Sequence, residues 1–159
     1  MTGVDAAPAM LLHAQEADPE GEYVLADAAA LPFDEGAFDC AVAFNSLMDV
    51  DDMPGAVRET ARVLEPGARF CICITHPFRD AGAFRGETFV IAEPYLETRP
   101  FELTVARAGL EVSFSGWAHP LETYTRALED AGFVIEAMRE PPDPGRPIPN
   151  FLLIRARRR

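Results

Sequence analysis

The sequence predicts an α/β fold that is built around a mostly parallel sheet, in a single domain of 159 residues, 1–159. Three short apolar segments, Tyr23 to Ala26, Phe38 to Phe44 and Arg69 to Ile74, have the length of strands. The second and third are almost continuously apolar, which favours parallel strands covered on both faces. A helical pattern lies between them, and the order strand, helix, strand predicts a crossover unit of an α/β sheet.

The central helix is predicted from its start and stop signals. Asp52 precedes it and Pro54 stands just inside, as is typical of a helix start. Pro66 and Gly67 suit the second and third positions of a type II turn, so we expect the helix to end before them. Apolar residues recur between these signals at helical spacing: Met53, Val57, Ala61 and Leu64.

Further elements are predicted on both sides of this unit. The opening segment MTGVD is a short apolar approach to Asp5, and Pro8 starts a helical pattern. Pro120 starts another helix, which Gly132 closes. Two more strand segments follow, Phe133 to Met138 and Phe151 to Ala156, across a loop rich in Pro and Gly.

The composition suits one acidic domain. Hydrophobic residues make up 48% of the chain, enough for a core, and the net charge is −12. This charge argues against phosphate-backbone binding, so we expect no nucleic-acid partner. The one basic cluster is interpreted as a solvated strand end: Arg155, Arg157, Arg158 and Arg159. No apolar run approaches the ~20 residues of a membrane span and no signal peptide is recognisable, so no membrane partner is expected.

The three cysteines, Cys40, Cys71 and Cys73, all lie inside apolar strand segments. Their odd number and the lack of metal-ligand spacing predict reduced, buried thiols and no metal site. Reduced thiols are typical of the cytoplasm.

Motifs in this framework resemble class I S-adenosylmethionine (SAM) dependent methyltransferases, of the type 11-like domain. Asp27 ends one strand, Ala-Leu-Pro-Phe follows from Ala30 to Phe33, and Phe38-Asp39 opens the next strand. The run ETARVLEPGAR, from Glu59 to Arg69, is similar to the family's passage from helix to strand. The resemblance covers nearly the whole chain. It implies a three-layer, Rossmann-like methyltransferase sheet with an antiparallel C-terminal strand and a small β-rich insertion.

The resemblance also implies SAM-binding residues at the carboxyl ends of strands. Asp5 would accept hydrogen bonds from the ribose hydroxyls. Asp27 would accept from the adenine amino group, with the N–H of Ala28 at the ring, and Asn45 would meet the methionine end. The residues alone also allow Asp5 as a helix N-cap, and Asp27 and Asn45 as turn residues. In-line methyl transfer rests on proximity, so no fixed catalytic residue is expected.

Candidates for the methyl-acceptor site follow the third strand segment. His76 would orient or deprotonate the nucleophile, since the ordinary pKa of His lies near neutrality, or it is a loop residue. Residues 79–118 carry turn and strand signals and predict a β-rich insertion, which in the family often forms a lid over the acceptor. Tyr95, Trp117 and His119 are candidate pocket residues, and core packing is the alternative for the two aromatic residues.

The family's Gly-rich turn has no counterpart here, because no G-x-G occurs and the chain would begin at the family's second strand. The segment Phe38 to Phe44 would then carry an unpaired apolar edge, through which a homodimer could form. We expect weak or no SAM binding by this chain alone. A misassigned start or a truncated relic would explain the pattern.

The sequence therefore predicts a SAM-dependent methyltransferase that acts on an O, N or C nucleophile of a small molecule. The alternative is a non-catalytic interaction protein that pairs through its exposed sheet edge; a stable dimer without SAM binding would favour it. A nicotinamide enzyme of the Rossmann type fits Asp5 but lacks the dinucleotide glycines.

Overall fold

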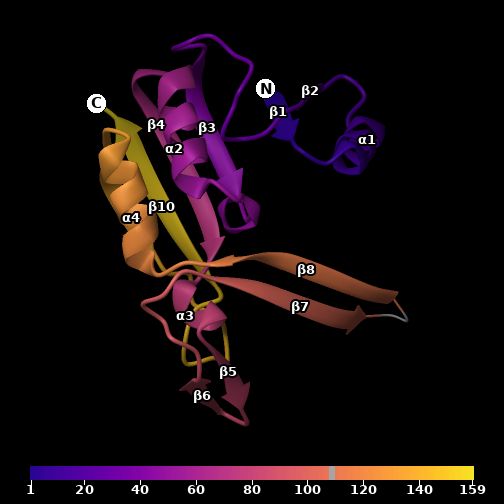
Figure 1. The fold of residues 1–159 in the computed structure, drawn as a ribbon, viewed down its shortest axis with the longest axis vertical. Coiled ribbons are helices and arrows are strands. Elements are labelled where there is room, and N and C mark those ends of the chain that lie inside the picture. Colours follow the sequence, from indigo (N-terminus) through magenta and orange to yellow (C-terminus); the bar gives the residue numbers. More distant parts are fainter. Residues whose placement is uncertain (108–109) are drawn as a thin grey trace.

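The strands of this protein fall into one four-stranded and three two-stranded sheets in a computed structural model that describes residues 1–107 and 110–159 (Figure 1). The four-stranded sheet has the order β3-β4-β10-β9. Strand β3 (Phe38–Phe44) runs parallel to β4 (Leu64–Thr75). Strand β10 (Phe151–Arg158) runs antiparallel to β4 and to β9 (Phe133–Arg139). The α/β fold class and the antiparallel C-terminal strand are thus confirmed.

Two helices cover one face of this sheet, α2 (Met53–Val63) and α4 (Leu121–Asp130) (Figure 1). Helix α2 begins at the predicted position, where Asp52 Oδ1 accepts a hydrogen bond of 2.8 Å from the N–H of Gly55. Both helices carry an apolar stripe toward the sheet. The most deeply buried core side chains are Met53, Val57, Leu64, Phe70, Ile74, Leu128, Leu152 and Ile154.

Strand β4 is longer than the sequence predicts, because it begins at Leu64 rather than Arg69. Leu64 already pairs with Phe38, and the ladder resumes at Cys40 with a shift in register. The expected turn after α2 is therefore an irregularity within the strand. Gly67, at φ +85°, supplies the left-handed backbone that this irregularity requires.

The other face of the sheet is open in the described part of the chain, which corrects the expectation that both faces are covered. Side chains alternate along β3, so Ala43 is buried under the helices while Val42 and Phe44 point away and are 72% and 68% exposed. A hollow of about 360 Å³ lies on this open face, lined mainly by apolar side chains together with Arg139 and Arg155.

Strands β1 (Thr2–Asp5) and β2 (Glu22–Leu25) form a parallel ladder of their own beside the main sheet, with α1 (Pro8–Ala17) connecting them (Figure 1). The elements lie where the sequence predicts them. Neither strand is buried, because no residue before Ala43 is buried. Among the described strands, β1 pairs only with β2 and β3 pairs only with β4.

The segment after β4 is rich in β structure. Helix α3 (Pro77–Asp80) is followed by the hairpin of β5 (Gly82–Arg85) and β6 (Thr88–Ile91). A longer hairpin follows, β7 (Arg99–Arg107) and β8 (Leu110–Ala118). Figure 1 shows both hairpins projecting from the end of the sheet at which β3 and β4 terminate.

The base of the longer hairpin lies against η1 (Leu47–Asp49), the short 3-10 helix that follows β3. A Cβ atom on Gly116 of β8 would stand only 2.7 Å from the backbone oxygen of Met48. Gly116 therefore permits an approach that a larger residue would obstruct. This contact places the hairpin beside the carboxyl end of β3.

The cysteines correct one further expectation. All three are free thiols, but Cys40 is exposed and Cys71 half-buried, whereas Cys73 is buried. Cys71 and Cys73 line the hollow on the open face. Cys40 belongs to the edge strand β3, whereas Cys71 and Cys73 belong to β4, which has a strand on each side. Among the described residues, no helix is long and apolar enough to pass through a bilayer.

Candidate functional site

Two acidic residues lie together at the carboxyl end of the β1–β2 ladder. Asp5 is the last residue of β1, where it pairs with Leu25, and Asp27 follows β2 by two residues. The N–H of Ala26 donates a hydrogen bond of 3.1 Å to the backbone oxygen of Asp5. Because the strands are parallel, both residues leave the ladder on the same edge, the position at which open α/β sheets bind ligands.

Each of these carboxylates uses one oxygen to shape its own loop. Asp5 Oδ1 accepts from the N–H of Ala7, and Asp27 Oδ1 accepts from the N–H of Ala29, both at 2.8 Å. Asp5 is not a helix N-cap, since Ala7 holds that position in α1. Asp27 is a turn residue, as the sequence allows. Within the described chain, the second oxygen of each carboxylate has no hydrogen-bond partner.

The loop after β2 also presents one backbone donor. The N–H groups of Ala29 and Ala30 both donate to Asp27, whereas the N–H of Ala28 has no acceptor among the described residues. A free N–H beside a carboxylate matches the donor and acceptor edge of an adenine ring. These residues therefore fit the adenosyl group that the sequence predicts here.

Asn45 stands at the end of β3 in a left-handed conformation, with φ +49°. Asn tolerates this backbone better than most residues, which accounts for its place in the turn. Its N–H donates to the backbone oxygen of Cys73 at 2.8 Å, so the turn is held to β4. Asn45 belongs to the main sheet, and Asp5 and Asp27 to the smaller one. It remains a prediction that Asp5, Asp27 and Asn45 contact the same cofactor molecule.

The ring of His76 is held in place by hydrogen bonds at both of its nitrogen atoms. Its ring is buried and caps α3, where Nδ1 accepts a hydrogen bond of 3.3 Å from the N–H of Phe78. This leaves the proton on Nε2, which lies 2.9 Å from Glu140 Oε1 and donates to it. Since both ring nitrogens are engaged, this geometry favours an orienting role over a role as general base.

Tyr95 joins His76 through one intervening aromatic ring. The ring of Phe78 stacks on His76 at 5.3 Å and packs against Tyr95 at 4.6 Å between centroids. The hydroxyl oxygen of Tyr95 accepts a hydrogen bond of 3.2 Å from the N–H of Leu121. The segment between the hairpins is thereby fastened to the start of α4.

His119 is buried where the longer hairpin meets α4. Its Nδ1 lies 3.2 Å from the hydroxyl of Thr98, and its ring meets the ring of Tyr124 edge-on at 5.4 Å. Its Nε2 is buried and has no hydrogen-bond partner among the described residues. Burial lowers the pKa of His119, so the ring is neutral at neutral pH. A small pocket of which His119 forms part is also lined by Tyr95, Arg99 and Pro77.

Trp117 lies apart from this pocket, at the base of β8. Its indole N–H donates to Asp51 Oδ1 at 3.0 Å, and the side chain is half-buried. Of the four acceptor-site candidates, the structure therefore brings His76, Tyr95 and His119 to the region between α3 and α4 and leaves Trp117 at the hairpin base.

Two further titratable residues belong to this region and were missed by the sequence. Burial raises the pKa of Asp80 to about 6, although Arg99 and Arg79 act in the opposite direction. Burial also raises the pKa of Tyr124, and the charges of Asp80 and Asp49 add to the effect. Asp80 follows Arg79 in a polar loop sequence, so nothing in the pattern indicated its burial. Tyr124 occupies one apolar position of a helix, which predicts burial of the ring but not the neighbouring charges of Asp80 and Asp49. Perturbed acids and phenols gathered beside a pocket are typical of functional sites.

Comparisons with known proteins show what the chain is similar to in sequence and fold. Residues 1–72 match the family described as "Methyltransferase domain". The chain is 44% identical over 50 residues to the demethylmenaquinone methyltransferase of Mycolicibacterium gilvum, across 31% of this chain and 22% of that relative. It is 45% identical over 51 residues to the ubiquinone/menaquinone biosynthesis C-methyltransferase UbiE of Hahella chejuensis, across 32% and 20%. The chain thus matches only about a fifth of the length of these curated relatives.

Solved structures extend the similarity over the whole chain. An S-adenosylmethionine dependent methyltransferase from Mesorhizobium loti superposes with a TM-score of 0.78 and 28% identity, over 99% of this chain and 79% of that one. The glycopeptide N-methyltransferase MtfA, complexed with S-adenosyl-L-homocysteine (SAH), gives a TM-score of 0.72 over 99% and 72%, but at 16% identity this likeness concerns the fold alone.

Asp5 ends β1, and Asp27 and Asn45 follow the carboxyl ends of β2 and β3, the kind of position at which open α/β sheets bind ligands. Residues 1–72 are similar to the methyltransferase-domain family, and the chain as a whole is similar to a SAM-dependent methyltransferase of known structure.

Proposed function

We propose that this protein transfers the methyl group of SAM to an O, N or C nucleophile of a small molecule. The observation that carries the proposal is the adenosyl-type edge after β1 and β2, where two carboxylates and the N–H of Ala28 keep hydrogen-bonding capacity. SAM supplies an activated methyl group when it is bound. Asp5 then holds the ribose hydroxyls, Asp27 and Ala28 hold the adenine edge, and Asn45 meets the methionine end.

The acceptor is proposed to bind between α3, the base of the longer hairpin and α4. His76, Tyr95 and His119 line or support this region, and Trp117 borders it at the hairpin base. Residues 79–118 act as the lid over it. Methyl transfer then depends on holding the acceptor in line with the methyl group, a requirement of position rather than of a dedicated acid or base.

The test is SAH binding measured by titration calorimetry, with variants at Asp27. Asp27→Ala removes the proposed adenine acceptor and should abolish measurable binding. Asp18→Ala is the matched control, because Asp18 also accepts a backbone N–H two residues on, at Glu20, but lies at the far end of the ladder. Equal SAH affinity in the wild-type protein and Asp27→Ala would contradict the proposal. A parallel titration with SAM tests the expectation that this chain alone binds SAM weakly or not at all.

We further propose that two copies pair through the free edge of β3. Support comes from Val42 and Phe44, which are 72% and 68% exposed on a strand whose second edge has no partner among the described strands. Light scattering should give a dimer that Val42→Glu converts to a monomer. A monomeric wild-type protein would contradict this proposal. The three free thiols support a cytoplasmic location.

A further inference from the structure

The loop that carries Asp27 has an apolar contact with the core, because Ala28 packs against it as a partly buried residue. No residue before Ala43 is fully buried, so polar contacts are important in fixing the rest of the loop on the main sheet. The chain passes from that unit to β3 through residues 26–37. Whatever fixes this loop also sets where Asp27 and Ala28 stand relative to Asn45.

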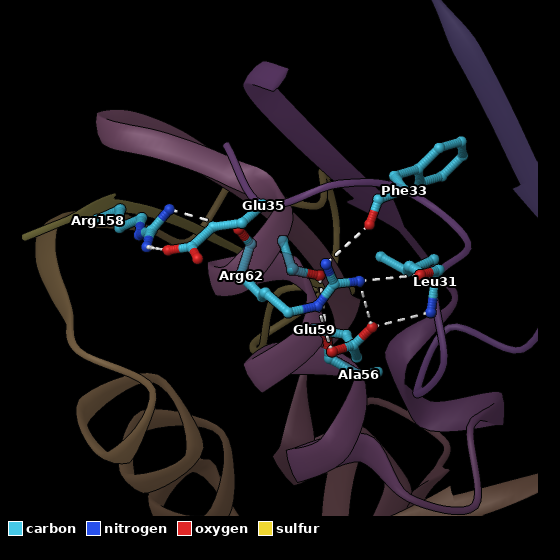
Figure 2. Close-up of polar contacts among 8 residues, drawn as sticks. Leu31, Phe33, Glu35, Ala56, Glu59, Arg62 and Arg158 are labelled. Atoms are coloured by element: carbon cyan, nitrogen blue, oxygen red, sulfur yellow. Dashed lines mark hydrogen bonds and ion pairs between the residues drawn. The ribbon is translucent and has the colours of Figure 1, made fainter. Parts of the chain in front are cut away.

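One ion pair on α2 holds the middle of this loop (Figure 2). Arg62 Nε donates to Glu59 Oε1 at 2.8 Å, and its terminal nitrogens donate to the backbone oxygens of Phe33 at 2.7 Å and Leu31 at 2.9 Å. Glu59 Oε2 accepts from the N–H of Leu31 at 3.0 Å and from Arg62 at 2.8 Å. The pair thus satisfies both backbone groups of Leu31, four residues after Asp27.

The end of the loop, at Glu35 and Gly36, is also held by contacts with Arg62 and with the strands of the main sheet. The N–H of Gly36 donates to the backbone oxygen of Arg62 at 3.0 Å. From β10, Arg158 reaches Glu35 Oε1 at 3.2 Å (Figure 2). Arg158 also donates to the backbone oxygen of Leu64. The loop is therefore fixed from residue 31 to residue 36 by polar contacts with α2 and the strands that follow it.

The chemistry of this contact is specific to arginine. A planar guanidinium can bind a carboxylate with two nitrogens and still direct donors at two carbonyl oxygens, whereas an ammonium group is a single point of contact. Hydrogen bonds from Arg62 also lower the pKa of Glu59, so the carboxylate is charged at neutral pH. These bonds are not needed by α2 itself, which has its own N-cap and apolar stripe.

We propose that Glu59 and Arg62 are positioning residues that hold the loop after Asp27 in the conformation that takes the adenosyl group. They set cofactor affinity without touching the cofactor. This inference rests on the proposed function, because it assigns the loop to SAM. It predicts an effect on the apparent KM for SAM rather than on kcat, since the transferred methyl group lies at the other end of the cofactor.

The experiment compares Arg62→Ala, Arg62→Lys and Glu59→Gln with Arg58→Ala. Arg58 is a matched control because it is an exposed arginine of α2 whose ion pair does not involve the loop. Its guanidinium forms this ion pair with Asp52 at 3.6 Å. SAH affinity is measured by calorimetry, and amide hydrogen exchange is followed over residues 28–36. We expect Arg62→Ala to weaken SAH binding about tenfold or more, the loss typical of charged hydrogen bonds, and to speed exchange in the loop. Arg62→Lys should recover little, and Arg58→Ala should match the wild-type protein.

The outcomes separate the two proposals. Unchanged SAH affinity or unchanged loop exchange in Arg62→Ala, with a wild-type protein that binds SAH, overturns the positioning role alone. A wild-type protein that binds no SAH overturns the proposed function and the cofactor role of the pair together. If Arg62→Ala unfolds, Glu59→Gln decides by the same two measurements, because it keeps the size of the side chain and removes the charge.

Discussion

Replacing Asp80 by Asn should stabilise this protein at neutral pH and leave its stability unchanged in acid. Burial raises the pKa of Asp80 from 3.8 to about 6, despite the opposing charges of Arg99 and Arg79. The folded state therefore holds the proton more tightly than the unfolded chain does between these two values. The associated stability is fully present below about pH 4 and is lost as the pH rises through 6.

The size of the effect follows from the two pKa values. A difference of one unit between the folded and unfolded pKa corresponds to about 1.4 kcal/mol. Because the pKa of Asp80 rises from 3.8 to about 6, the charged carboxylate destabilises the folded state by about 3 kcal/mol. This is an upper value, because part of the side chain meets solvent. Asp80→Asn removes the charge and should raise the free energy of unfolding by up to that amount at pH 8.

The assay is urea unfolding from pH 4 to pH 8, followed by the fluorescence of Trp117, the single tryptophan. Urea is chosen because it does not screen charges as guanidinium does. Asp39→Asn is the control, since Asp39 is exposed at the start of β3. Equal stability of Asp80→Asn and the wild-type protein at pH 8 would refute the reasoning. So would a stability difference at pH 4 as large as that at pH 8.

Three further predictions concern the framework of the site. Phe70→Ala should lower the free energy of unfolding by about 3–5 kcal/mol, because the side chain is 2% exposed and packs against Phe133; a loss below 1 kcal/mol by urea unfolding would contradict this. Asn45→Val should cost about 1–3 kcal/mol, since a β-branched residue is strained at φ +49°, whereas Asn45→Gly should unfold at nearly the wild-type midpoint. Asp52→Ala should cost about 1 kcal/mol in thermal unfolding through loss of its hydrogen bond to Gly55, and Asp52→Asn should restore most of it.

The elements were largely predictable because their signals are local. Strand β3 has the bounds expected from its apolar run, and α2 begins after Asp52 and ends before Pro66, as its start and stop residues indicate. The class of protein followed from motifs along the same segment. The exposure of β1, of β2 and of one face of β3 was not predictable in this way, because the sequence of an apolar strand does not show which of its faces the rest of the molecule covers.

In the candidate site too, some residues were predictable from local sequence signals, whereas others were identified only from the tertiary structure. Asp5, Asp27 and Asn45 were proposed from the family resemblance, and their positions were predictable because Asp5 ends β1 and the other two come shortly after β2 and β3. The contacts of His76 with Glu140 and of Arg62 with Leu31 join residues 64 and 31 positions apart. Only the packing of α2, α3 and the strands brings these groups together, since hydrogen bonds depend on distance in space, and no spacing along the chain encodes it.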